Sequence, residues 1–220
     1  MAKRTDKLKQ DPWETKSLTT SIQDVFRSSA FSDLTIICDN REFKVHKVII
    51  SMQSGYFARM FRHDWKEVQE GVIRLQEDDP SAIEAMLHFM YGYQYDRPDV
   101  IKSPESAMLL HVKVYQAGDK YGIPRLKDKA MKKFATSTME FWETDGFTIA
   151  VAEVYSTTPP GDRGLRDTAV AVSIEHLQAL QEKQSFQEVL RETPGFAADI
   201  ILSPSSELGN KELGMLELLG

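Results

Sequence analysis

The chain has 220 residues, of which 41% are hydrophobic and 27% are charged, as is typical of a globular protein with a sizeable core. Its formal net charge of −6 and the lack of a basic stripe argue against nucleic acid as a partner. The single cysteine, Cys38, excludes an intrachain disulfide, and no apolar run is long enough to cross a membrane. We therefore expect an intracellular protein, cytoplasmic or nuclear, that binds neither a membrane nor a cofactor.

The N-terminal region predicts a helix followed by a strand. Residues 17–29 carry apolar side chains at helical spacing, and residues 1–16 are expected to form a solvated tail before them. After the helix, "SDLTIICDN" alternates between inward and outward positions, as a strand of a sheet does. The expected inward face holds Leu34, Ile36 and Cys38.

A hairpin, two short helices and a third strand are expected next. Asp39-Asn40 is a turn signal between the first strand and a second one, "REFKVH". The segments "KVIISMQ" and "GYFARMF" then have helical character, and Ser54 is placed to cap the second of them. The third strand, "GVIRL", follows the segment that contains Trp65.

Proline residues mark the starts of the next three helices. Asp79 and Pro80 begin "PSAIEAMLHFMY", whose apolar residues recur at helical spacing. A loop separates it from a helix that starts at Ser103-Pro104, and Pro124 opens a third helix, "PRLKDKAMKKF".

The chain beyond these helices is expected to be helical but less regular. Helices are expected in "GFTIAVAEVY", "LRDTAVAVSIEHLQAL" and "SFQEVLRE", and the apolar segment "GFAADIILSP" must pack somewhere. The chain thus divides into an N-terminal tail and helix (1–30), a mixed domain (31–136) and a helical C-terminal extension with a mobile tail (137–220).

No motif in the sequence indicates catalysis. Nucleotide-binding loops, nucleophile elbows and zinc-protease motifs are absent. His88 and His111 lie among apolar residues of expected helices, where a histidine is usually structural. Cys38 is expected to be a core residue, and Asp78-Asp79 is better explained by helix capping than as a catalytic pair. The sequence therefore predicts a protein that is not an enzyme and holds no metal.

The order of the elements and three motifs resemble the BTB/POZ domain family. The motifs are "SDLTIICDNREFKVHKVIISMQSGYFARMF", "LHFMYGYQY" and "AGDKYGIPRLKDKAMKKF", all within residues 31–136. The whole chain is also similar to fungal proteins whose only recognisable domain is BTB. The resemblance implies an α+β fold, with a small sheet capped by helical hairpins, and a role in protein–protein interaction.

Self-association is one implication of the resemblance, because family members often pair through the N-terminal helix and the adjoining helices. The side chains expected in a homodimer are Leu18, Ile22, Val25 and Phe26, although this helix could instead pack on its own domain. Asp33 and Lys47 match a charged pocket of transcription-factor members. The alternative, which we favour, is that these two residues satisfy nearby backbone and charged groups.

Cullin binding is a second implication, drawn from "FRHDWKEVQEGVIRL". Trp65-Lys66-Glu67 matches the hydrophobic-x-glutamate pattern that cullin adaptors of the family carry before the third strand. A hydrophobic anchor in a partner's groove can contribute roughly 2–3 kcal/mol. The docking surface would also include Tyr56, Met60 and Tyr95. The alternative is that Trp65 folds back over Met60 or Phe61 and covers the edge of the core.

Two functions follow from the resemblance. One is an adaptor that recruits an unknown target protein to a cullin-RING ubiquitin ligase. The other is a dimerising scaffold or transcriptional regulator that never contacts a cullin. Kelch, MATH and zinc-finger patterns are absent, so residues 137–220 are the only candidate for target selection, but they could instead lengthen a cullin contact.

Overall fold

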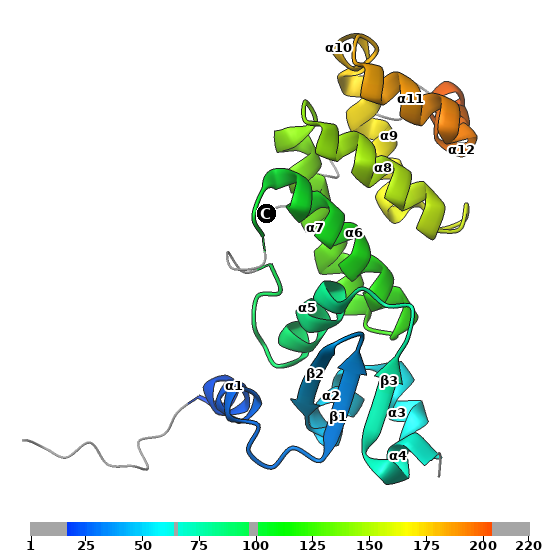
Figure 1. Ribbon diagram of the computed structural model, residues 1–220. Coiled ribbons are helices and arrows are strands. Elements are labelled where there is room, and N and C mark those ends of the chain that lie inside the picture. Colours follow the sequence, from blue (N-terminus) through cyan, green and yellow to red (C-terminus); the bar gives the residue numbers. More distant parts are fainter. Residues whose placement is uncertain (1–16, 64–65, 97–100, 204–220) are drawn as a thin grey trace, which may run out of the picture.

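The computed structural model describes residues 17–63, 66–96 and 101–203, which form one small sheet and the helices around it. Figure 1 shows the sheet with α2 to α5 at one end, α8 to α12 at the other, and α6 and α7 between them. The predicted α+β fold with a helical extension is confirmed. The tails expected at residues 1–16 and 204–220 lie outside the described residues.

The sheet confirms the predicted hairpin and third strand. Its strands are β1 (Leu34–Cys38), β2 (Arg41–Val45) and β3 (Val72–Leu75), in the order β2-β1-β3. β1 pairs antiparallel with β2 through a turn at Asp39, whose φ is 53°, and parallel with β3. Asp tolerates this left-handed conformation better than most residues. The predicted inward face is also confirmed, because Leu34, Ile36 and Cys38 are buried.

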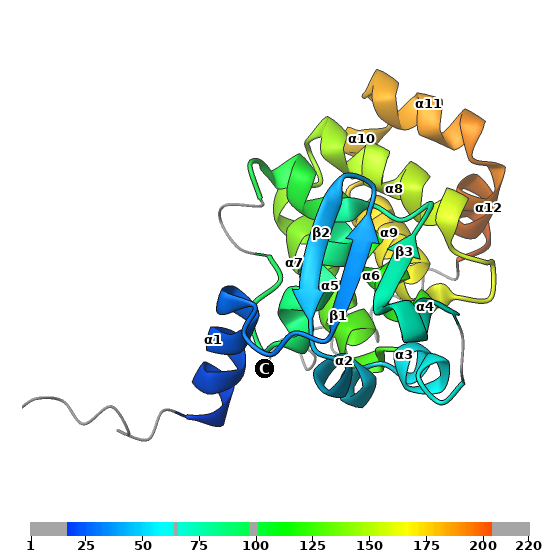
Figure 2. The ribbon, with the colours of Figure 1, turned by 60° about the horizontal axis from the view of Figure 1, so that its bottom comes forward.

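Four short helices precede or connect the strands. They are α1 (Leu18–Ser28), α2 (Lys47–Gln53), α3 (Gly55–Met60) and α4 (Lys66–Glu70). Ser54 caps α3 as predicted, because its side chain accepts a hydrogen bond of 3.2 Å from the backbone N–H of Phe57. The sequence did not predict α4, whose five residues include one apolar side chain, Val68, and so carry no helical stripe. Figure 2 shows α2 and α3 at one end of the strands.

The next three helices begin at the predicted prolines. They are α5 (Pro80–Met90), α6 (Pro104–Lys120) and α7 (Pro124–Phe141). Asp79 accepts hydrogen bonds from the backbone N–H groups of Ser81 and Ala82, at 2.9 and 3.0 Å. Ser103 and Ser106 form a reciprocal capping box at the start of α6. α7 runs seven residues beyond the predicted Phe134, because the buried Thr138 continues its inward stripe.

The described part of the C-terminal extension, up to residue 203, contains five helices. They are α8 (Asp145–Thr157), α9 (Arg163–Glu175), α10 (Leu177–Leu180), α11 (Gln184–Glu192) and α12 (Pro194–Leu202). One helix was predicted where α9 and α10 occur, but the chain breaks at His176, whose ring stacks on Trp142 with centroids 3.9 Å apart. The apolar segment of α12 buries Phe196 but leaves Ile201 and Leu202 exposed.

Asp162 joins this extension to α6 and α7. It caps α9, accepts a hydrogen bond of 2.5 Å from the Tyr115 hydroxyl and pairs with Lys127 at 2.8 Å. Partial burial opposes ionisation, but the hydrogen bonds from Lys127 and Tyr115 lower the pKa of Asp162 below its usual value. Lys127 also pairs with Asp119 at 2.6 Å, so one ammonium group links residues from three helices or their caps.

The contact between α6 and α7 depends on a missing side chain at Gly118. A Cβ atom at this position would lie 2.8 Å from the backbone nitrogen and 3.0 Å from the Cα of Lys127. A steric clash with backbone atoms at such distances can be relieved only by moving one helix away from the other. Gly118 therefore sets how closely the two helices approach.

We expect Gly118→Ala to lower the free energy of unfolding by about 1–3 kcal/mol, because the added methyl group overpacks this contact. The matched control is Gly161→Ala, since nothing lies within 4 Å of a Cβ at that position. Urea unfolding followed by circular dichroism would measure both variants. Equal unfolding midpoints for the two variants would contradict the assignment of the close contact to Gly118.

Candidate functional site

Three exposed apolar side chains lie on and beside α2, and we call them the α2 patch: Phe31, Val48 and Met52. Their exposed fractions are 91%, 61% and 77%, which is unusual for large apolar side chains. Val48 and Met52 are four residues apart and therefore share one face of α2. This patch was not predicted from the sequence. Its signal is that "KVIISMQ" carries apolar residues all around a short helix, more than one buried face can use.

Hydrogen bonds hold the Phe31 loop against the start of α2. The carbonyl of Ala30 accepts from Nε2 of His46 at 2.7 Å, and Oδ1 of Asp33 accepts from the backbone N–H of Lys47 at 2.7 Å. The other ring nitrogen of His46 is 2.7 Å from the Tyr91 hydroxyl. Phe31 thus lies between two residues that are each bonded to the N-terminus of α2, so its loop is held at the start of this helix.

The charged pocket suggested for Asp33 and Lys47 does not form as a direct side-chain pair. Asp33 uses its carboxylate on the backbone N–H of Lys47, and the Lys47 ammonium donates to the carbonyl of Val68 at 3.0 Å. Both residues satisfy neighbouring backbone groups, as the favoured alternative expected.

The four side chains expected in a dimer contact are divided between two roles. Ile22 and Phe26 pack against the core of their own domain, and the ring of Phe26 stacks on Tyr91 with centroids 4.2 Å apart. Leu18 is 76% exposed, and Val25 is half-buried. Part of α1 is therefore anchored on its own domain, and Leu18 remains the clearest surface residue of the four.

The structure describes the expected cullin-docking segment only in part. Trp65 lies outside the described residues. Lys66 and Glu67 are exposed in the first turn of α4, and Lys66 pairs with Glu70 at 3.6 Å. Tyr56 is half-buried with its ring edge against Tyr121, whereas Met60 is buried and offers little surface to a partner.

The expected place of Tyr95 on this surface is wrong. Tyr95 is 1% exposed, and its hydroxyl lies 2.9 Å from Nδ1 of His111 in α6. The pKa of His111 is lowered from 6.5 to about 4, chiefly because burial desolvates the ring; the charge of Asp96 opposes this shift and that of Lys133 adds to it. These two buried side chains support the fold and do not belong to a docking surface.

The structure places Cys38 in the core and Asp78-Asp79 at the start of α5. Within the described ranges, no group of three His, Cys, Asp or Glu side chains could hold a metal ion, and no helix has the length and apolarity of a membrane span. Cys38 is buried in the core, and burial raises the pKa of its thiol, which makes it a poor nucleophile. Asp79 caps α5 as predicted, but Asp78 instead pairs with Lys120 at 2.9 Å.

Comparison with known proteins assigns the family. A model of the BTB/POZ domain matches residues 22–138, which is more than half of the chain. The chain belongs to the BTB/POZ domain family. A BTB/POZ domain is a protein–protein interaction module, which directs attention to the exposed surfaces of this chain.

Curated relatives of this BTB/POZ chain include mouse proteins. TD and POZ domain-containing protein 1-like (Mus musculus) is 27% identical over 140 residues, which cover 64% of this chain and 36% of that protein. TD and POZ domain-containing protein 1 (Mus musculus) is 23% identical over 194 residues, covering 86% of this chain and 48% of that protein. The chain therefore spans less than half the length of these relatives.

We expect the stability of the BTB/POZ chain to depend on pH through His111. Unfolded His111 takes up a proton below pH 6.5, but the folded pKa of about 4 keeps it neutral, so stability falls as pH decreases through this window. The loss approaches about 1.4 kcal/mol for each pH unit.

Urea unfolding across this pH range would test the expectation. His111→Gln, which retains an acceptor for the Tyr95 hydroxyl, should show a shallower pH dependence than the unmodified chain. His176→Gln, a change at the histidine that stacks on Trp142, serves as the control. An unchanged slope in His111→Gln would show that other groups cause the dependence.

Proposed function

We propose that this chain is a non-enzymatic interaction module that pairs with a second copy of itself through the α2 patch and Leu18. The observation that carries the proposal is the exposure of Val48 and Met52 on one face of α2 and of Phe31 in the loop that is bonded to the start of this helix. Exposed large apolar side chains are costly in water and are typically covered by a partner when they gather on one surface.

A second copy is the partner that the family supports. BTB domains commonly self-associate, and an isologous contact needs only one self-complementary patch on each copy. The positions of Ile22 and Phe26 fit this proposal, because their packing on Tyr91 and the core fixes α1 on its own domain. Leu18 then projects from a rigid element, and α2 supplies most of the apolar contact area.

We expect Val48→Lys combined with Met52→Lys to weaken self-association by roughly 10-fold or more, because both buried contacts would be replaced by charges. Light scattering over a concentration series would measure the oligomeric state. The matched control is Met139→Lys combined with Ile149→Lys, which changes two exposed apolar residues elsewhere, 41% and 56% exposed. A monomeric wild-type chain at high micromolar concentration would refute the proposed pairing.

A second candidate function is that of an adaptor for a cullin-RING ubiquitin ligase. The supporting observation is that Lys66 and Glu67 are exposed in α4, directly after Trp65 and close in sequence to α3. Exposed residues in this pattern are available to a partner, whereas residues packed into the core are not. The two functions are compatible, since the α2 patch and α4 use different residues.

We expect the chain to bind the N-terminal domain of the cullin that recruits BTB proteins, and Trp65→Ala to weaken this binding roughly 30-fold or more. Calorimetric titration would measure the affinities. Glu67→Ala should also weaken binding, whereas Glu70→Ala, which removes a nearby exposed glutamate of the same helix, should not. Absence of binding by the unmodified chain would leave the dimerising scaffold or transcriptional regulator as the function.

A further inference from the structure

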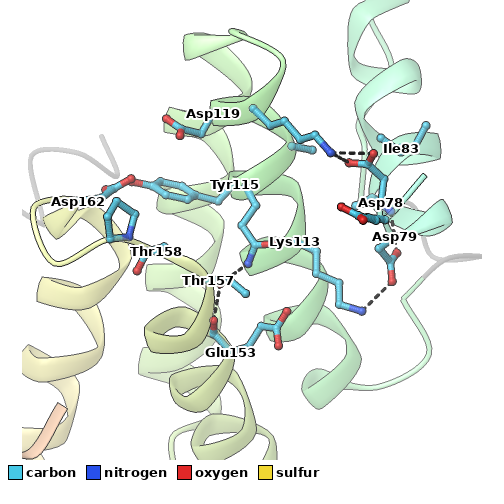
Figure 3. A pocket seen from close by; sticks show the side chains of 16 residues that line it. Asp78, Asp79, Ile83, Lys113, Tyr115, Asp119, Glu153, Thr157, Thr158 and Asp162 are labelled. Atoms are coloured by element: carbon cyan, nitrogen blue, oxygen red, sulfur yellow. Dashed lines mark hydrogen bonds and ion pairs between the residues drawn. The ribbon is translucent and has the colours of Figure 1, made fainter. Parts of the chain in front are cut away.

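A groove lies between the sheet-containing part of the chain and the C-terminal extension, as Figure 3 shows. Its volume is about 520 Å³, within the range of sites that hold a ligand or a few side chains of a partner. The floor is one face of α6, with Lys113, Gln116 and Ala117 at the spacing of adjacent helical turns. One wall is the segment 77–83, and the other is formed by the end of α8 and the residues up to Asp162.

Negative charge dominates the lining of the groove. Six carboxylates line it, against the two ammonium groups of Lys113 and Lys120. The carboxylates are those of Glu77, Asp78, Asp79, Asp119, Glu153 and Asp162. This excess of negative charge would stabilise a cation that enters the groove.

Within the part of the chain that the structure describes, four of these six carboxylates form ion pairs with lysines, and the other two do not. Asp78 and Asp79 pair with Lys120 and Lys113, and Asp119 and Asp162 pair with Lys127. Among the described residues, none of these three lysines pairs with Glu77 or Glu153. These two glutamates stand on opposite walls, so a cation between them would meet carboxylates from both sides.

The apolar part of the groove suits the stem of a long basic side chain. Ala82, Ile83 and Ala117, which are largely buried, contribute to the lining, and so does Pro159 on the wall that follows α8. Arginine can place its methylene groups along such a surface while its guanidinium reaches a carboxylate with two hydrogen bonds. Apolar residues beside acidic ones in the lining therefore favour arginine over a small inorganic cation.

We propose that this groove binds an arginine-containing segment of a target protein. The groove is built by both the sheet-containing part and the extension, so it exists only when the two are packed together. This binding site is separate from the surface proposed for self-association, because none of the described residues of α1 or α2 lines the groove. Target binding here and pairing through the α2 patch can therefore succeed or fail separately.

Fluorescence anisotropy of the full chain with a labelled peptide of alternating arginine and serine tests the proposal. The peptide should bind, and the same peptide with glutamine in place of arginine should not. Glu77→Gln combined with Glu153→Gln should weaken binding of the arginine peptide roughly 5-fold, since each lost ion pair contributes a modest amount. Gln116→Lys, which adds a competing cation to the floor, should weaken it as well.

The matched control is Glu42→Gln combined with Glu192→Gln, which removes the same charge from two exposed residues outside the groove. An equal loss of affinity in this control would show that net charge alone attracts the peptide and would overturn the proposal. Absence of binding by the unmodified chain would also overturn it. Urea unfolding midpoints verify that each variant is folded. Light scattering measures the oligomeric state of the groove variants. A changed oligomeric state would identify the groove as a contact between copies and would overturn the proposal.

Discussion

The burial of α6 on several sides is the constraint on which the rest of the structure depends. This helix contacts α5 near the sheet, α7 through the close approach at Gly118, and α8 in the extension. Its buried side chains include Met108, Val112 and Val114. One helix therefore supplies core to both parts of the chain, and the ion pairs of Lys127 add a polar link at the same junction. The extension is packed as part of the folded unit and is not a separate appendage.

Local rules predicted much of this fold. The alternation in β1, the turn at Asp39 and the caps at Ser54 and Asp79 depend on neighbours in sequence, and the structure has each of them. Contacts between distant residues were not predictable in this way. The break at His176 accompanies stacking on Trp142, and the burial of Tyr95 accompanies its hydrogen bond to His111 on a different helix. Neither leaves a pattern in its own segment.

The candidate surfaces also divide into those that a local sequence motif can predict and those that depend on contacts between distant residues. Sequence motifs identified the family and directed attention to α1 and to the segment around Trp65, which are residues that a motif can contain. The α2 patch and the groove on α6 became visible only in three dimensions, because each gathers residues from separated parts of the chain. Surfaces of this kind consist of side chains that remain exposed after the core has packed. Which side chains remain exposed depends on the packing of all the other helices.

The conformation of the Phe31 loop affects the entropy that is lost when a partner binds. Phe31 has a φ of 61°, a left-handed conformation that is rare for a bulky residue and persists only where the surroundings impose it. The bonds from Ala30 to His46 and from Asp33 to Lys47 impose it here. The backbone that carries the ring is thus held in place before any partner arrives. Little backbone conformational entropy remains to be lost at this point on association, so the loop would act as a preorganised attachment point.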